Sequence, residues 1–213
     1  MDGLSPTTIR QLYEHALDAP GPKTWWITRL AMYKALHRAL SEYDGNEKTC
    51  LSISGSKGLG VELGLTKTKY TEVSYPDANF IDLPFESDTF DFCVSDQVLE
   101  HVEGDPQKAF SESIRVVKPG GYVCHTTCFV NGIHAAPKDF WRFTPESLRL
   151  ISDNANAETI ACGGWGNREV IGLMASPLRM KPIPDDPANP IYQLALRNEP
   201  SWPIVVWIIS RRN

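Results

Sequence analysis

Polar residues that could take part in chemistry follow two predicted buried strands. The loop Gly55–Gly60 comes after the short strand Cys50–Ser54 and opens a helix. Asp96 and Gln97 come after Phe90–Ser95, an apolar run typical of a strand that is covered on both faces. In a parallel sheet the ligand lies beyond the carboxyl ends of the strands. We therefore expect both groups to face one crevice.

A second candidate group follows the predicted strand Tyr122–Thr127. A neutral imidazole can accept a hydroxyl proton near neutral pH. His134, oriented by Asp139, is therefore the candidate catalytic base, and the alternative that the pair only braces a loop stays open.

Three further residues in this part of the chain are candidate substrate contacts: His125, Trp141 and Arg142. An aromatic ring and a guanidinium could bind a ring face and an anionic group. The alternative is that Trp141 and Arg142 fasten the loop to the core.

The residue types of Cys124, His125, Cys128 and His134 could suggest zinc. Side chains alternate across a strand, so Cys124 and His125 would point to opposite faces. We therefore expect no metal ion at this set.

The composition is that of an ordinary globular protein. The 213 residues are 42% hydrophobic and 22% charged, with a net charge of −5, which argues against nonspecific nucleic-acid binding. The longest apolar run is too short to span a bilayer. Five cysteines, most of them in predicted buried strands, and the lack of a secretion signal favour a reducing, cytoplasmic compartment.

The alternation of strands and helices predicts a doubly wound, mostly parallel α/β sheet in one domain spanning 1–213. Residues 1–45 are expected to form a helical cover, and residues 48–213 the catalytic core. The patterns predict helices near residues 5–17, 24–43, 106–117 and from Thr144, further strands at 69–73, 158–161 and 204–210, and an exposed loop at 176–190.

Four motifs in a fixed order carry a family resemblance: Leu83-Pro-Phe85, Phe90-Asp91, Val98-Leu-Glu-His-Val102 and Val117-Lys-Pro-Gly-Gly121. With these, residues 48–150 resemble the class I S-adenosylmethionine-dependent methyltransferases of the type 11-like group. The stretch 134–144 is similar to a subgroup associated with glycan methylation.

This resemblance implies a Rossmann-like sheet of seven strands and S-adenosylmethionine as the cofactor. It implies cofactor contacts from the glycine loop, from a carboxylate on the second strand, from an amide–aromatic pair at the adenine and from the end of the Phe90 strand. In this sequence those positions are Ser54, Gly55, Ser56, Gly58, Glu72, Asn79, Phe80, Asp96 and Gln97. Asp91, Glu100 and His101 are expected to be structural.

The chain departs from the family pattern in the glycine loop. Its sequence Ser52-Ile-Ser-Gly-Ser-Lys-Gly58 has serines at the acidic position and at two glycine positions. The connection between Gly60 and Leu83 is also short, so a helix and a strand of the second or third strand region are expected to be trimmed.

The motifs and the resemblance predict an O-methyltransferase that acts on a small molecule, with a sugar, a sugar nucleotide or a glycan intermediate as the expected acceptor. Because the glycine loop is altered, a catalytically inactive partner subunit is an alternative. A nicotinamide-dependent oxidoreductase is the remaining alternative, although the strict dinucleotide pattern is absent. The sequence does not indicate an oligomeric state.

Overall fold

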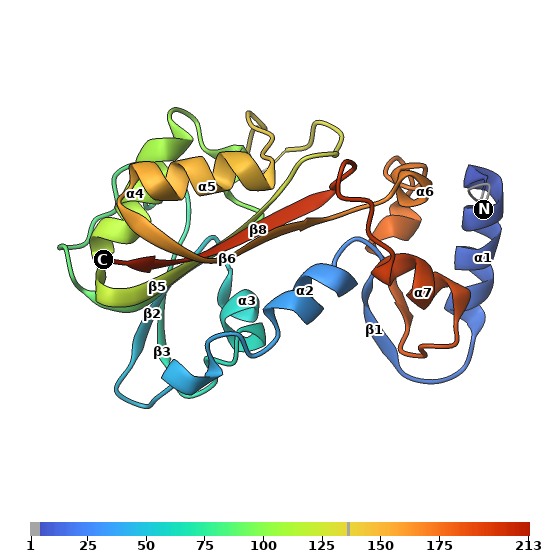
Figure 1. The fold of residues 1–213 in the computed structure, drawn as a ribbon, viewed down its shortest axis with the longest axis horizontal. Helices are drawn as coiled ribbons and strands as arrows, with labels where there is room; N and C mark the ends of the chain where they lie inside the picture. The colour runs from blue at the N-terminus through green and yellow to red at the C-terminus, as the bar shows by residue number, and fades with distance from the viewer. Residues whose placement is uncertain (1–4, 136) are drawn as a thin grey trace. The chain divides into compact units, whose positions relative to one another are not determined.

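The computed structural model describes residues 5–135 and 137–213 (Figure 1). Its contacts divide into two compact units. The larger unit comprises Leu36–Cys128, Ile133–Gly163 and Val206–Asn213. The smaller unit comprises the chain up to Ala35 together with Phe129–Gly132 and Gly164–Val205.

The larger unit is built on a six-stranded sheet with the order β3-β2-β4-β5-β8-β6. Its strands are β2 (Thr49–Ile53), β3 (Lys69–Val73), β4 (Phe90–Asp96), β5 (Val117–Cys128), β6 (Ala157–Trp165) and β8 (Val205–Arg212). This confirms the Rossmann-like α/β class, with six strands where seven were expected. Residues 74–89 contain neither a helix nor a strand, apart from a bridge between Asn79 and Asp82, which accounts for the difference.

The register of the parallel strands brings the polar groups to one edge of the sheet. β2 pairs in parallel with β3 and with β4, and β4 pairs in parallel with β5. Ile53 lies opposite Val73 on one side and Ser95 on the other. The residues that follow these three strands therefore emerge at the same edge.

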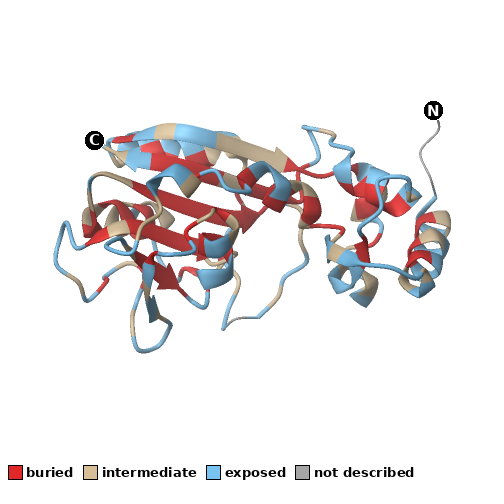
Figure 2. Cartoon of the chain, turned by 90° about the horizontal axis from the view of Figure 1, so that it is seen from below, coloured by how far each residue is buried: buried red, intermediate tan, exposed pale blue. Residues whose placement is uncertain are grey.

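Helices cover both faces of this sheet, with α4 (Pro106–Val116) and α5 (Pro145–Asn154) on one side and α3 (Lys57–Glu62) on the other (Figure 1). Asp105 caps α4, and Thr144 forms a capping box with Ser147 at the start of α5. Burial is concentrated along the strands (Figure 2), as expected for a sheet covered on both faces.

Three predicted elements were wrong. In place of a helix over residues 24–43 the chain forms β1 (Lys23–Trp26), α2 (Leu30–Leu36) and η1 (Ser41–Tyr43). Arg38 adopts a φ of 57°, which a continuous helix does not allow. The segment Lys118–Gly121 lies inside β5 instead of separating α4 from a strand. The expected loop 176–190 contains η3 (Pro177–Met180) and β7 (Pro182–Pro184).

The smaller unit has its own apolar core around α1 (Pro6–Asp18), which Ser5 caps. α1 contacts β7, α7 (Pro190–Leu196) and α6 (Arg168–Ile171), and β1 pairs with β7 in antiparallel fashion. The Lys23 ammonium donates hydrogen bonds to the last carbonyls of α1, at Ala16, Leu17 and Ala19. The N-terminal helix thus packs against C-terminal segments of this unit.

Among the described residues, no helix is both long enough and apolar enough to cross a membrane.

Candidate functional site

A pocket of about 220 Å³ opens at the carboxyl ends of β2 and β3 in the larger unit. Its wall comes from the ends of these strands, from the segment between β3 and β4, from η2 (Leu99–His101) and from the loop after β5. The lining residues are Ile53, Ser54, Val73, Ser74, Tyr75, Ala78, Asn79, Phe80, Leu83, Val98, His101, Val102, Glu103, Pro137 and Phe140.

The turn after β2 presents backbone to this pocket. Ser54 and Gly55 both have positive φ values, 56° and 76°, and the Ser54 amide donates to the Val73 carbonyl at 2.7 Å. Ser54 lines the pocket, while Gly55 and Gly58 do not. A Cβ atom on Gly58 would meet no atom within 4 Å, so this glycine is not required by close packing in the structure.

Ser56 was expected to contact the cofactor, and the structure instead places its side chain in a buried brace. Its hydroxyl donates to the Ile53 carbonyl at 2.5 Å and accepts from the Asp96 amide at 2.7 Å. The serine therefore ties the end of β2 to the end of β4. It stabilises the turn that carries Ser54.

Asp96 and Gln97 also brace the edge of the sheet and do not line the pocket. The Asp96 carboxylate accepts from the Thr126 hydroxyl at 2.5 Å. Gln97, with a φ of 58°, donates from its side-chain amide to the Thr126 hydroxyl and to the Thr127 carbonyl, each at 3.0 Å. Both side chains join the turn after β4 to β5.

The second strand contributes to the pocket through different residues from the one expected. Glu72 is exposed on the edge strand β3 and lies outside the lining, where Val73, Ser74 and Tyr75 take part instead. The rule that ligands lie beyond strand ends points to residues 74 and 75, since the strand ends at Val73.

The predicted amide–aromatic pair does lie in the pocket. Phe80 is 7% exposed and offers an apolar wall, and the side-chain Oδ1 of Asn79 accepts from the Ile81 amide at 3.2 Å. Val98 and His101 are further lining residues that the sequence analysis did not assign to the site.

His125 was expected to contact substrate, but the structure buries it completely between β4 and α4. Its two ring nitrogens are bonded to the hydroxyls of Ser95 at 2.7 Å and Ser113 at 2.9 Å. The rings of Phe80 and Phe110 lie 5.8 and 5.1 Å away. Burial lowers the pKa of His125 to about 3, so it stays neutral, and it has no access to a ligand.

His134 and Asp139, by contrast, form the pair that the sequence predicted. The Asp139 carboxylate lies 3.0 Å from His134 Nδ1 and also accepts from the His134 backbone amide at 3.0 Å. The pKa of Asp139 is well below its usual range, first because Arg142 donates two hydrogen bonds to it, at 2.5 and 2.7 Å. The carboxylate is therefore an ionised acceptor beside the imidazole.

Arg142 and Trp141 both have structural contacts in the loop. The Arg142 guanidinium is engaged by Asp139, and the Trp141 indole donates to the Val102 carbonyl at 3.0 Å. Trp141 is 39% exposed. These bonds agree with the alternative that Trp141 and Arg142 fasten the loop to the core. Neither residue lines the pocket.

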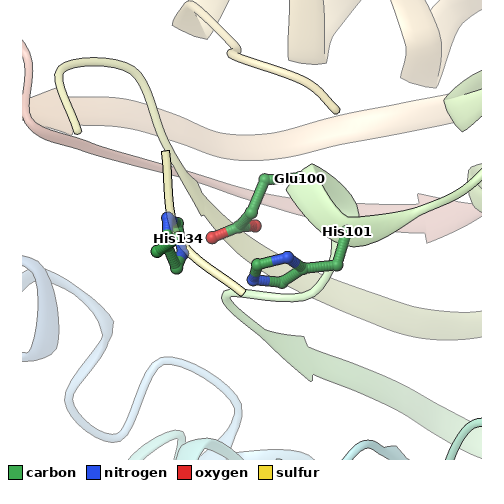
Figure 3. A group of neighbouring side chains, drawn as sticks. All are labelled: Glu100, His101 and His134. Atoms are coloured by element: carbon green, nitrogen blue, oxygen red, sulfur yellow. The ribbon is translucent and has the colours of Figure 1, made fainter. Parts of the chain in front are cut away.

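His134 lies beside Glu100 and His101 (Figure 3). Its ring meets that of His101 edge-on, with centroids 4.8 Å apart, and His101 lines the pocket. Glu100 is fully buried beside them, and its carbonyl accepts from the Phe140 and Trp141 amides at 2.8 and 3.1 Å. The loop after β5 is thereby attached to η2.

Asp91 has the anchoring role that was expected of it. Its carboxylate accepts from the backbone amide and hydroxyl of Thr49 and pairs with Lys48 and Lys118. It lies at the opposite end of β4 from the pocket, since it is the second residue of that strand.

Comparison with known proteins shows that residues 35–125 match the family model described as a methyltransferase domain. An uncharacterized methyltransferase of Schizosaccharomyces pombe is 37% identical over 84 residues, which are 39% of this chain and 30% of that protein. The match thus spans less than a third of the relative's length.

Solved structures show the same fold at low sequence identity. A putative methyltransferase of Haloferax volcanii, determined with the Trm112 methyltransferase activator, has a TM-score of 0.54 at 13% identity and covers 85% of this chain and 90% of its own. An S-adenosylmethionine-dependent methyltransferase of Mesorhizobium loti has a TM-score of 0.52 at 14% identity, covering 87% and 100% of the two chains.

Proposed function

We propose that this chain, whose residues 35–125 match the methyltransferase-domain family model, is a class I S-adenosylmethionine-dependent methyltransferase that binds S-adenosylmethionine in the pocket and transfers its methyl group to a hydroxyl of a small molecule. The observation that carries the proposal is the position of the pocket at the carboxyl ends of β2 and β3, lined by Ser54, Asn79 and Phe80. This is where the fold holds its nucleoside ligands.

The lining suits a nucleoside in its chemistry. Phe80, Leu83 and Val98 supply apolar surface for the adenine ring, and Asn79 supplies an amide for its polar edge. Ser74 and Tyr75 offer hydroxyls near the end of β3, where a ribose would need hydrogen-bond partners. Small residues at 54 and 55 leave room for backbone to approach the methionine part.

His134 is the candidate base for the acceptor hydroxyl. In the transfer, the acceptor oxygen forms a bond to the methyl carbon while the carbon–sulfur bond breaks, and the sulfur leaves with its electron pair as a neutral thioether. The hydroxyl proton passes to the His134 imidazole, and the ionised Asp139 stabilises the imidazolium that forms. Positioning of the oxygen in line with the carbon–sulfur bond contributes the rest.

The acceptor that we propose is a sugar, a sugar nucleotide or a related glycan intermediate. The support is the resemblance of residues 134–144 to a glycan-associated subgroup, together with two residues of this stretch, Pro137 and Phe140, that line the pocket. A screen of methyl transfer over sugar nucleotides and small phenols, read by mass spectrometry, tests the acceptor class.

Calorimetric titration with S-adenosylmethionine and with its demethylated product tests cofactor binding. We expect binding by the full chain, and a loss of about tenfold or more in Phe80→Ala, since a stacked aromatic contributes more than 1 kcal/mol. Leu150→Ala, at an exposed position of α5, is the matched control and should bind normally. A folded protein that gives no heat with either compound would contradict the proposal and favour an inactive partner subunit.

A further inference from the structure

Three side chains that the sequence analysis did not group as metal ligands converge beside the pocket: Glu100, His101 and His134 (Figure 3). Glu100 and His101 are adjacent in η2, and His134 comes from the loop after β5. Each offers one atom able to ligate a metal, and these atoms lie within 4.8 Å of one another. All three belong to the larger unit.

The Glu100 carboxylate has a buried oxygen that the protein does not satisfy. The side chain is fully buried, and Oε2 accepts from the Thr127 hydroxyl at 2.7 Å. Oε1 has no hydrogen-bond partner among the described residues. A buried carboxylate oxygen without a donor is costly, and a bound cation would remove that cost.

Both imidazoles are held through Nδ1. His101 Nδ1 lies 2.7 Å from the Lys138 carbonyl, and His134 Nδ1 lies 3.0 Å from the Asp139 carboxylate. Each of these acceptors requires a proton on Nδ1, which places the lone pair of each neutral ring on Nε2. Metal-binding histidines are characteristically oriented in this way, by a carbonyl or a carboxylate.

From these observations we propose that Glu100, His101 and His134 bind a divalent transition-metal ion, with Zn²⁺ as the probe. Two imidazole nitrogens and one carboxylate oxygen form a recognised three-ligand zinc set that leaves a coordination position open. Ligands around tetrahedral zinc lie about 3.4 Å apart, so the two partly exposed imidazoles need to move by roughly an ångström. Because His101 lines the pocket, the ion would lie at its wall.

Binding of the ion does not depend on methyl transfer, since it can be measured without cofactor or acceptor. It does bear on how an acceptor would be activated. The His134 lone pair can take either a proton or a metal ion, so the two roles compete. With the ion bound, an acceptor hydroxyl at the open position would be polarised by the metal instead of deprotonated by the imidazole.

The experiment titrates the full chain, stripped of metal with a chelator, with Zn²⁺ in a calorimeter. We expect one ion per chain in the wild type and at least a tenfold loss of affinity in each of Glu100→Gln, His101→Ala and His134→Ala. Asp139→Asn, which alters the residue that orients His134, should lose about 10- to 100-fold. His15→Ala, an exposed histidine of α1, is the control and should bind as the wild type does.

Two further readouts keep the result specific. Co²⁺ should give the visible absorption of a nitrogen- and oxygen-ligated ion, without the near-ultraviolet bands of thiolate ligation. Saturating Zn²⁺ should raise the melting temperature of the wild type but not of His101→Ala. Circular dichroism checks folding, and if Glu100→Gln does not fold, the two partly exposed histidines decide the question.

The proposal is overturned if folded His101→Ala and His134→Ala bind Zn²⁺ as tightly as the wild type. It is likewise overturned if Co²⁺ absorption shows cysteine ligation, or if the wild type binds no stoichiometric ion. None of these outcomes changes the titration with S-adenosylmethionine, so failure of the metal site and failure of the proposed function can be told apart.

Discussion

His125 and His134 lie nine positions apart, and the structure places them in opposite environments. His125 is fully buried on β5, with one serine hydroxyl at each ring nitrogen and phenylalanine rings beside it. His134 is partly exposed in the loop after β5, next to an ionised carboxylate and a second imidazole.

These environments suit His125 to packing and His134 to proton transfer. Burial lowers the pKa of His125 to about 3, so this imidazole remains neutral and exchanges no proton in the working range. His134 differs because it is partly exposed and its Nδ1 lies 3.0 Å from the Asp139 carboxylate, which orients the ring. The comparison therefore predicts that one histidine controls stability and the other controls turnover.

We expect the strongest loss in turnover. His134→Ala should lower the rate of methyl transfer about 10²- to 10⁴-fold, because it removes the proposed base for the acceptor proton. Affinity for S-adenosylmethionine should stay within a few-fold of the wild type, since His134 does not line the pocket. Single-turnover rates with saturating cofactor, paired with calorimetry, measure the two quantities.

The control for this prediction is His37→Ala, which removes an exposed histidine that pairs with Glu62. It should leave turnover unchanged. A His134→Ala protein as active as this control would remove His134 from the mechanism and leave it a loop brace.

His125→Ala should act on stability instead. It removes a buried ring and leaves the hydroxyls of Ser95 and Ser113 without their partner, so we expect a loss on the order of 3 kcal/mol in the free energy of unfolding. Urea denaturation measures this loss. The turnover per folded molecule should change little. A large loss of turnover in a variant with wild-type stability would show that His125 acts in catalysis and not in packing.

The elements that carry these residues were predictable, because apolar runs and capping residues act locally. The bounds of β3, the buried run of β4 and the Thr144 cap of α5 all follow from such patterns. The prediction of one helix over residues 24–43 was wrong because it rested on apolar spacing alone. Apolar spacing does not reveal a residue such as Arg38, whose positive φ ends the helical path.

The directions of the site's side chains were less predictable. Alternation along β5 correctly separates Cys124 from His125, but helices cover both faces of this sheet, so alternation does not tell a buried position from an accessible one. The side chains of Ser56 and Gln97 can both donate and accept hydrogen bonds, so they could equally well hold the backbone together or bind a ligand. Their hydrogen bonds to Ile53, Asp96 and β5 follow from the folded geometry alone.

The smallest expected effect, and the one that isolates His125 most cleanly, is on the pH dependence of stability. The ordinary pKa of histidine is 6.5, and burial lowers that of His125 to about 3 in the folded protein. Between these values the unfolded chain binds a proton at this position and the folded chain does not. The stability that His125 contributes is therefore complete above pH 6.5 and is lost as the pH falls toward 3, by about 1.4 kcal/mol per pH unit.

His125→Phe keeps a ring of similar size against Phe110 and removes the titrating group. Its free energy of unfolding, measured in urea at pH 6.5, 5.5 and 4.5, should fall less steeply than that of the wild type. Carboxylates such as Asp91, whose ordinary pKa is about 4, begin to protonate in the lower part of this window in both proteins, so the difference between the two slopes isolates His125. Parallel slopes in the two proteins would show that His125 titrates equally in both states, which its two serine bonds and complete burial do not allow.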